Sequence, residues 1–185
     1  MAKRDLLRNI ILLLLVVCVF IGLRIWVFDL YKIKNQDANH YLKTGDYILA
    51  MKNELPKYGE FVLYEVNGKD HVGRIIATEN DKVTYMDDVL YLNDKIKTED
   101  YLLNYKEKYQ ASLQNGGYFT HDFTIATLPK VKSDKVTKNS YLILNDNRKD
   151  TSDSRSFGLV SQKQIRGVIH FRLFPLNKFG FIENK

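Results

Sequence analysis

The amino-acid sequence predicts a mainly β, antiparallel β-sheet domain with one or two short helices, preceded by an N-terminal transmembrane helix. Three observations lead to this fold class. An apolar run without charges lies at residues 10–23. Short stretches rich in β-branched and aromatic residues recur from residue 47 onward, separated by turn residues. Residues 164–173 follow a period of two. The 185 residues leave room for one membrane segment and one globular domain.

The apolar run is long enough to cross a bilayer. Together with the residues after Arg24 it gives the stretch Ile10–Phe28, about 28 Å of helix at roughly 1.5 Å per residue. We expect the Arg24 side chain to lie along the hydrocarbon and to place its guanidinium among the lipid headgroups. Aromatic residues that suit this interface follow at the same end, namely Trp26, Phe28 and Tyr31.

A cleaved secretory signal peptide is the competing interpretation of this run, because such a peptide also has a basic segment and an apolar core. The residues that follow, Trp26 to Lys32, contain no pair of small side chains for a cleavage site, so an uncleaved anchor is favoured. Lys3, Arg4 and Arg8 precede the span. The positive-inside rule then predicts a single-pass cell-membrane protein with a cytoplasmic N-terminus at 1–8, an anchor at 9–28 and an extracytoplasmic domain at 29–185.

Strands and hairpins are expected through most of the exported part. Asn67-Gly68 is a strong signal for a two-residue type I′ turn, which needs positive φ at both positions, and Asp87-Asp88 marks a second hairpin. The expected strands are Tyr47–Met51, Phe61–Val66, His71–Ala77, Val83–Met86, Val89–Leu92 and Gln164–Leu173.

One segment has a helical pattern instead. Apolar residues recur at helical spacing in a Lys/Glu-rich background, which predicts a short amphipathic helix that ends at Gly116-Gly117. The residues that set this spacing are Tyr101, Leu102, Tyr105, Tyr109 and Leu113. Ser133–Asn139 is polar and is expected to be a loop.

Composition excludes several classes of function. The net charge is +6, but the first 28 residues hold four basic residues and one acidic residue, so the exported part carries only +3. That excess is too small to indicate a nucleic-acid partner. Cys18 is the single cysteine, which excludes an intramolecular disulfide. No Cys/His pair has metal-ligand spacing, and no metal or cofactor is expected. The four histidines are scattered: His40, His71, His121 and His170.

Several segments, in order, resemble the type I signal peptidases. That family has a short cytoplasmic N-terminus, a transmembrane helix and then a motif of the form Ser-Met-x-Pro-Thr-Leu-x-x-Gly-Asp. Here Leu42, Gly45 and Asp46 keep its spacing. Further segments resemble later parts of the family pattern in the same order: residues 58–64, Val72–Ile76, Val89–Asn93, residues 171–176 and residues 180–182.

The most specific match is to the family's Gly-Asp-Asn-Arg…Asp-Ser-Arg box. It lies at residues 145–158, where Asn145 replaces the first Gly and the spacing is kept. The resemblance covers nearly all of the chain and implies the family's fold, with a peptide groove near the membrane. It also implies that the box supports the floor of the site. The residues concerned are Asp146, Asn147, Arg148, Asp153, Ser154 and Arg155, with Thr151 where the family has a serine that orients its lysine.

The two catalytic positions of the family are changed. The family cleaves with a serine nucleophile and a lysine base, and the resemblance places Asp37 and Gly73 at these positions. Asp37 has no hydroxyl and Gly73 has no amine, so neither half of a Ser/Lys dyad is present. The resemblance also implies a peptide groove lined by Asp37, Asn39, Tyr41, Leu42, His71 and Gly73, with Tyr41 and Leu42 as its apolar contacts.

An unusual catalyst remains an alternative. His71 stands two residues before Gly73 on an expected strand, hence on the same face, and an Asp37/His71 pair has the groups needed to activate water. His40, three residues after Asp37, is a weaker alternative. An aspartic mechanism needs a second carboxylate, and the sequence nominates none.

Three functions follow from these observations. The first is a catalytically inactive, membrane-anchored peptide-binding or assembly factor. The resemblance suggests pilin subunits or a sortase as partners, because Gram-positive pilus gene clusters often encode a signal-peptidase-like protein. The second is an active signal peptidase with a non-standard site. The third is a structural membrane protein with no affinity for peptides.

Overall fold

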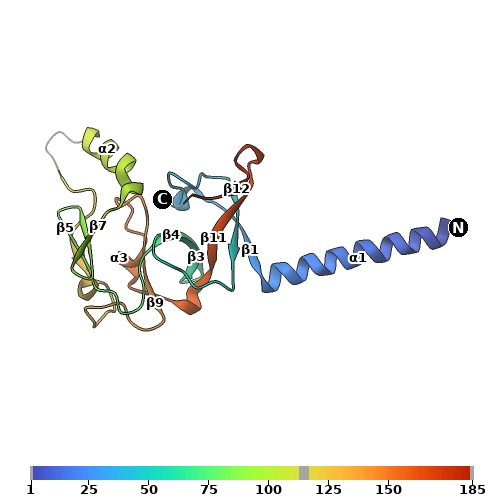
Figure 1. Cartoon of the computed structure of the whole chain (residues 1–185), viewed down its shortest axis with the longest axis horizontal. Helices are drawn as coiled ribbons and strands as arrows, with labels where there is room; N and C mark the ends of the chain where they lie inside the picture. Colours follow the sequence, from blue (N-terminus) through green and yellow to red (C-terminus); the bar gives the residue numbers. More distant parts are fainter. Residues whose placement is uncertain (1, 113–116, 184–185) are drawn as a thin grey trace.

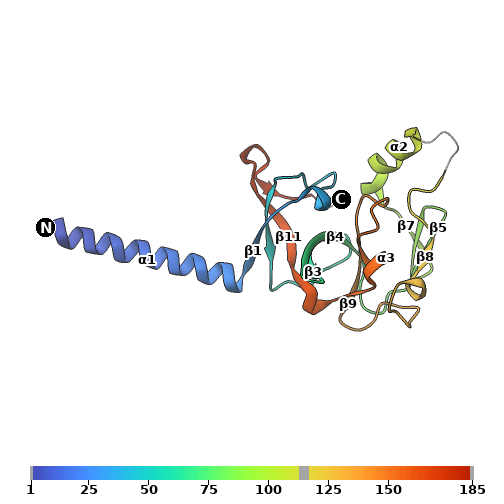
Figure 2. The ribbon, with the colours of Figure 1, turned by 180° about the vertical axis from the view of Figure 1, so that it is seen from behind.

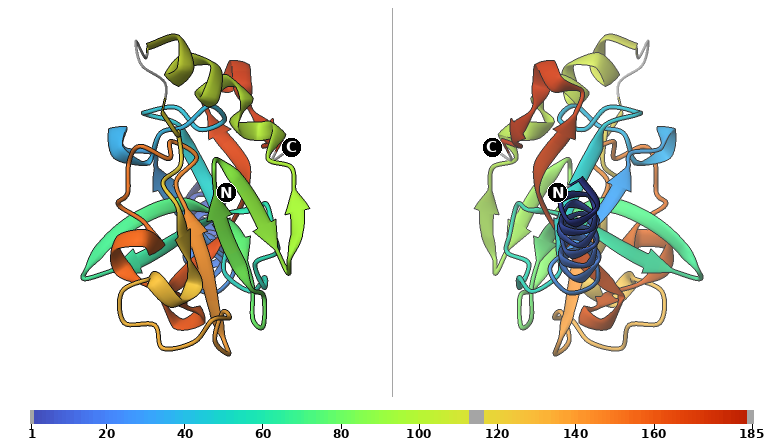
Figure 3. Two further views of the ribbon diagram at one scale, coloured as in Figure 1. Left: turned by 90° about the vertical axis from the view of Figure 1, so that its left-hand side faces the viewer. Right: turned by 90° about the vertical axis from the view of Figure 1, so that its right-hand side faces the viewer.

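The structure is a computed structural model, and it describes residues 2–112 and 117–183. Helix α1 (Ala2–Trp26) projects from the rest of the molecule as a straight rod (Figure 1). It is long and apolar enough to cross a membrane, and none of its apolar window is buried against the domain. Seen along α1 from its N-terminal end, the sheets lie behind the helix (Figure 3, right). The prediction of an N-terminal apolar helix followed by a β domain is confirmed.

The end of α1 joins the helix directly to the sheet. The helix stops at Trp26, two residues before the predicted end of the span, and Phe28 already begins β1 (Phe28–Lys32), where it is paired with Met51 of the next strand. The Arg24 guanidinium forms an ion pair with the buried Asp29 carboxylate, which is stabilised by a cationic partner.

A chain of ion pairs continues from this point into the domain. Asp29 pairs with Arg166 as well as with Arg24, and Arg166 Nη1 lies 2.7 Å from the Asp70 carboxylate. The Lys52 ammonium donates to the Arg24 carbonyl at 3.0 Å. The last turn of α1 is thus bound to β1 and to strands that lie far away in the sequence.

The main sheet has eight strands in the order β1-β2-β11-β3-β4-β9-β10, with β12 paired to β11. All of its pairings are antiparallel. Figure 2 shows β3, β4 and β11 between α1 and the rest of the domain. The bounds are β2 (Tyr47–Met51), β3 (Phe61–Val66), β4 (Lys69–Ala77), β9 (Ser140–Leu144), β10 (Val160–Ser161), β11 (Ile165–Phe174) and β12 (Gly180–Phe181).

A smaller sheet lies at the end of the domain opposite α1 (Figure 1). Its strand order is β7-β6-β5-β8, and Asp87-Asp88 forms the expected turn between β5 and β6 with φ of 52° and 63°. The equivalent turn of the main sheet, Asn67-Gly68, has φ of 51° and 73°. The bounds are β5 (Val83–Met86), β6 (Val89–Leu92), β7 (Lys95–Lys97) and β8 (Phe123–Thr124).

Short helices connect the strands. The predicted amphipathic helix is a 3-10 turn, η2 (Asp100–Leu102), followed by α2 (Leu103–Ser112). Tyr105 and Tyr109 of α2 pack on Phe119, with ring centroids 6.0 and 5.7 Å away. Leu113 and Gly116 lie outside the described residues. The remaining helices are η1 (Asn35–Asp37), η3 (Ile125–Thr127), α3 (Ser154–Phe157), η4 (Gln162–Gln164) and η5 (Leu176–Lys178).

Candidate functional site

Three cavities adjoin one another through shared lining residues, and the row that they form is called the trough below. The Asp37 cavity, about 360 Å³, lies among η1, the β3–β4 hairpin and the 145–157 segment. The middle cavity, about 100 Å³, shares Gln36, Asp37, Val72, Asn145 and Asp150 with it. The α2 cavity, about 310 Å³, lies between the 38–44 loop and α2. It shares Ala38, Asn39 and Asn147 with the middle cavity.

The Asp37 carboxylate lies where the first two cavities meet, on the last residue of η1. It is only 5% exposed. The Tyr31 hydroxyl donates to its Oδ2 at 2.7 Å, and the Val72 amide donates to its Oδ1 at 3.3 Å. Burial raises the pKa of Asp37 above its ordinary value, and these hydrogen bonds oppose that rise. Both carboxylate oxygens are therefore already engaged by the protein.

The His71 imidazole lines the same cavity from β4. Its ring stacks on Tyr64 with centroids 5.5 Å apart and contacts Phe157 at 5.1 Å. Burial lowers the pKa of His71, while the nearby Asp37 and Asp70 carboxylates act in the opposite direction. Among the described residues no hydrogen bond joins His71 to Asp37. The structure brings the two groups to one cavity without a hydrogen bond between them.

Gly73 lies at the wall of the middle cavity, in the extended backbone of β4. A Cβ on Gly73 would meet Ile143 Cγ2 at 2.6 Å, the Leu144 carbonyl oxygen at 3.3 Å and Tyr64 Cε1 at 3.5 Å. Contacts below 3.0 Å force a neighbour to move. A Cβ at this position would therefore press on the buried side chain of Ile143.

The structure corrects the predicted apolar rim of the groove. Leu42 is completely buried in the core cluster that also contains Ile48 and Phe61, so a peptide has no access to it. Tyr41 is half-buried, with its ring 5.9 Å from Phe61 and 5.3 Å from the Arg74 guanidinium carbon. The 39–42 turn points these two side chains inward because the Asn39 carboxamide accepts from both of their amides, at 2.8 and 2.9 Å. Asn39 itself lines the trough.

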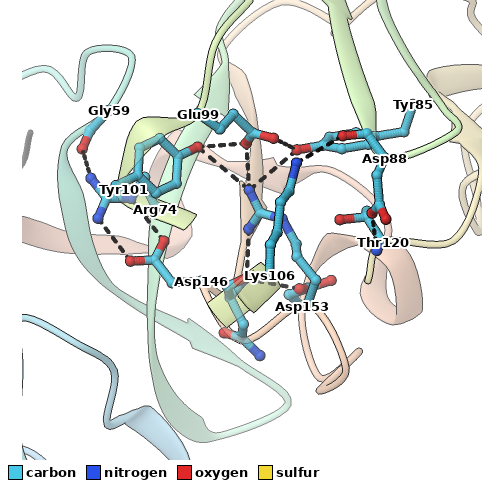
Figure 4. Close-up of polar contacts among 12 residues, drawn as sticks. Gly59, Arg74, Tyr85, Asp88, Glu99, Tyr101, Lys106, Thr120, Asp146 and Asp153 are labelled. Atoms are coloured by element: carbon cyan, nitrogen blue, oxygen red, sulfur yellow. Dashed lines mark hydrogen bonds and ion pairs between the residues drawn. The ribbon is translucent and has the colours of Figure 1, made fainter. Parts of the chain in front are cut away.

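The floor of the trough rests on a buried ion pair. Asp146 accepts two hydrogen bonds from the Arg74 guanidinium, at 2.8 and 2.7 Å, and both side chains are fully buried (Figure 4). Arg74 also donates to the Gly59 carbonyl at 2.8 Å and stacks on Tyr101, 4.0 Å from the ring centroid. Asn147, the next residue, is exposed and lines the middle and α2 cavities.

A second buried pair ties the same segment to the smaller sheet. The Arg148 guanidinium lies 2.6 Å from the Glu99 carboxylate, which also accepts hydrogen bonds from the hydroxyls of Tyr85 and Tyr101 (Figure 4). Desolvation of Arg148 opposes its charge, but Glu99 keeps the pKa of Arg148 above its ordinary value. This arrangement is structural, since none of these groups lines the trough cavities described above.

The rest of the box closes the turn after β9. Asp153 begins α3, accepts from the Asn145 amide at 2.9 Å and pairs with Arg155 at 2.6 Å. The Ser154 hydroxyl accepts from the Ile143 amide at 3.0 Å. Thr151 is exposed on this turn, whereas its neighbours Asp150 and Ser152 line the Asp37 cavity.

Several groups that line the trough were not predicted from the sequence. They are Gln36, Lys69, Asn145, Asp150 and Ser152. Lys69 follows the Asn67-Gly68 turn, and Asn145, Asp150 and Ser152 lie within the 145–158 box. The sequence signal that could have identified these residues was their position next to segments that match the family pattern. In residues 2–112 and 117–183, no group of three or more His, Cys, Asp or Glu side chains is placed to hold a metal ion.

The structure is a β protein with an N-terminal helix long and apolar enough to span a membrane, and with a row of adjoining surface cavities. Comparison with known proteins gives the family. The family described as "Signal peptidase, peptidase S26" matches residues 6–174. Signal peptidase IB of Staphylococcus aureus (strain MRSA252) is 34% identical over 97% of this chain and 95% of its own length. Signal peptidase I of Bacillus caldolyticus is 31% identical over 89% and 90%.

A solved structure agrees with these sequence matches. The crystal structure of a signal peptidase I from Enterococcus faecalis V583 superposes with a TM-score of 0.57 at 33% identity, over 62% of this chain and 97% of that one. The chain therefore belongs to the signal peptidase family. The predicted family and its fold are confirmed.

Proposed function

We propose that this protein is a catalytically inactive member of the family that binds extended peptides at the outer face of the membrane and acts as a chaperone-like factor in surface pilus polymerisation. The observation that carries the proposal is the trough itself. It includes residues 37 and 73, yet position 37 offers a carboxylate engaged by Tyr31 and Val72, and position 73 offers no side chain. A groove can bind a peptide through its backbone without cleaving it.

The proposal includes a topology and partners. Lys3, Arg4 and Arg8 lie in the first turns of α1, before its uncharged apolar run, so in this proposal the N-terminus is cytoplasmic and the trough faces outward. The partners are then proteins met at that surface, namely pilin subunits or a sortase, beside the lipid bilayer. No nucleic acid is among the proposed partners.

A second candidate is an active peptidase with a non-standard site. It is favoured by one observation: the Asp37 cavity also contains the hydroxyl of Ser152, the amine of Lys69 and the imidazole of His71. Against it, both Lys69 and Ser152 are exposed, so no dry pocket keeps that amine neutral as a lysine base requires.

The full-length protein in detergent is expected to leave a pre-protein with an Ala-x-Ala site uncut, because the groups of the Ser/Lys dyad are missing. The measurement is gel and mass-spectrometric detection of the mature product, with the S. aureus signal peptidase IB on the same substrate as the positive control. Site-specific product that disappears in Asp37→Ala would establish an Asp37/His71 mechanism. Product that disappears only in Ser152→Ala would establish the Ser152 site.

Filling the trough is expected to abolish pilus polymer in cells. Gln36→Trp with Asn147→Trp places two large rings in the trough at exposed positions, so the fold is preserved. The matched control is Gln162→Trp with Lys138→Trp, also exposed but away from the trough. Polymer length is followed by immunoblot, and protein abundance and digestion by protease added to protoplasts are followed in parallel. Wild-type polymer with the trough variant stably present would reject the assembly role, and protection of the domain from protease would reject the outward topology.

A further inference from the structure

The α2 cavity differs in charge from the rest of the trough. Its walls carry Lys43 and His40 from the 38–44 loop and Lys108 from α2, and no Asp or Glu is among its lining residues. The remaining polar wall is made of the side-chain amides of Asn39, Asn104 and Asn147 with the hydroxyl of Thr44. By contrast, the Asp37 cavity holds Asp37 and Asp150 beside Lys69 and His71.

Neither ammonium group of the α2 cavity has a carboxylate partner among the described residues. The Lys43 Nζ donates to the Asn39 carbonyl at 3.1 Å. Lys108 has no hydrogen bond or ion pair among these residues. Two ammonium groups that line one cavity from opposite walls, with no carboxylate between them, favour an anionic ligand.

The α2 wall of this cavity is held in place. Tyr105 of α2 lines the cavity and packs on Phe119, with ring centroids 6.0 Å apart. Burial raises the pKa of Tyr105 to about 12, so the phenol stays neutral and adds no negative charge. The wall that carries Lys108 is thus packed against the segment that leads into β8.

We propose that the α2 cavity is a carboxylate-binding subsite of the peptide trough. It takes one carboxylate of the bound peptide, either an Asp or Glu side chain or the C-terminal carboxylate, between Lys43 and Lys108. The amides of Asn39, Asn104 and Asn147 supply additional donors. This inference rests on the proposed peptide-binding function, and it adds both a preference for acidic peptides and a direction for the chain along the trough.

The first test is selection of ligands by the full-length protein in nanodiscs of uncharged lipid. The probe is a random decapeptide library presented in two forms, one fused at its C-terminus and one with a free C-terminus. Enrichment of Asp and Glu in the fused form identifies a side chain as the source of the carboxylate. If peptides are enriched only in the form with a free C-terminus, and without a preference for Asp or Glu, the C-terminal carboxylate is identified as the source. Peptides without either preference would overturn the subsite while leaving peptide binding intact, and failure to enrich any peptide would overturn the proposed function as well.

The second test measures affinity with one enriched peptide by fluorescence anisotropy. Lys43→Gln with Lys108→Gln is expected to raise Kd about tenfold at low ionic strength, with a smaller ratio in high salt, because the contacts are partly solvent-exposed charges. The matched control, Lys132→Gln with Lys138→Gln, removes the same charge from exposed positions outside the cavity and is expected to change Kd by less than about twofold. Equal loss of affinity in both double variants would mean that only the overall charge matters and would reject the subsite.

Discussion

Restoring the dyad of the family with Asp37→Ser and Gly73→Lys is expected to destabilise the protein and to give no cleavage. The obstacle is Ile143, whose Cγ2 lies 2.6 Å from the position of a Cβ on Gly73, with the Leu144 carbonyl oxygen next at 3.3 Å. Forcing extra atoms into a packed core costs about 1–3 kcal/mol. A lysine displaced by this contact also cannot reach the geometry that a general base needs. Urea unfolding and the cleavage assay measure the two effects.

The steric cause of this destabilisation can be separated from the effect of the charge on the lysine. Gly73→Ala adds only the clashing methyl group, so it should already lower stability. Ile143→Leu removes the Cγ2 methyl at nearly constant volume, and in that background the cost of Gly73→Ala should shrink, giving a coupling in the double-mutant cycle. Additive effects, or a fully stable and active Ser/Lys variant, would show that Ile143 does not close this space.

Removal of one charge from the buried Arg74–Asp146 pair is expected to be the most damaging single change in the floor of the trough. Asp146→Asn leaves the Arg74 guanidinium buried without its counter-charge, and loss of one partner of such a pair costs about 3–5 kcal/mol. Chemical denaturation followed by near-ultraviolet circular dichroism measures this loss.

An exposed pair provides the matched control. Asp94→Asn makes the same chemical change opposite Lys82, and the two side chains are 75% and 40% exposed, so the unfolding midpoint should be unchanged. If the two variants unfolded at the same denaturant concentration, the Arg74–Asp146 pair would not hold the floor of the trough.

Six of the twelve strands in the described residues could be predicted, because local sequence determines them. The Asn67-Gly68 and Asp87-Asp88 turns specify both hairpins through their positive φ angles. The five-residue strands β1 and β9 were missed, as were the short strands β7, β8, β10 and β12. The four short strands have two or three residues each and too little periodicity for a pattern to be visible. Their pairing is decided by the strands beside them.

Motif spacing in the sequence was enough to predict which residues lie at the site. It was not enough to predict the direction in which their side chains point. Position counting placed Asp37, His71 and Gly73 near one another, and all three lie in one trough. It did not show that Leu42 points into the core, because the Asn39 turn that directs it is a three-dimensional feature. It also did not show that Ile143 occupies the space beside Gly73, since those residues are 70 positions apart in the sequence.

The ion pairs at the base of α1 connect the helix to the domain. With α1 in a bilayer, the links from Arg24 through Asp29 and Arg166 to Asp70 would restrain the helix relative to the strand that carries His71. The trough would then stand within a narrow range of heights above the lipid surface. A second protein, anchored in the same membrane by its own apolar segment, could reach the trough only with residues at a certain distance along its chain from that segment. Binding of such a ligand would then depend on the distance of these residues from the membrane as well as on their sequence.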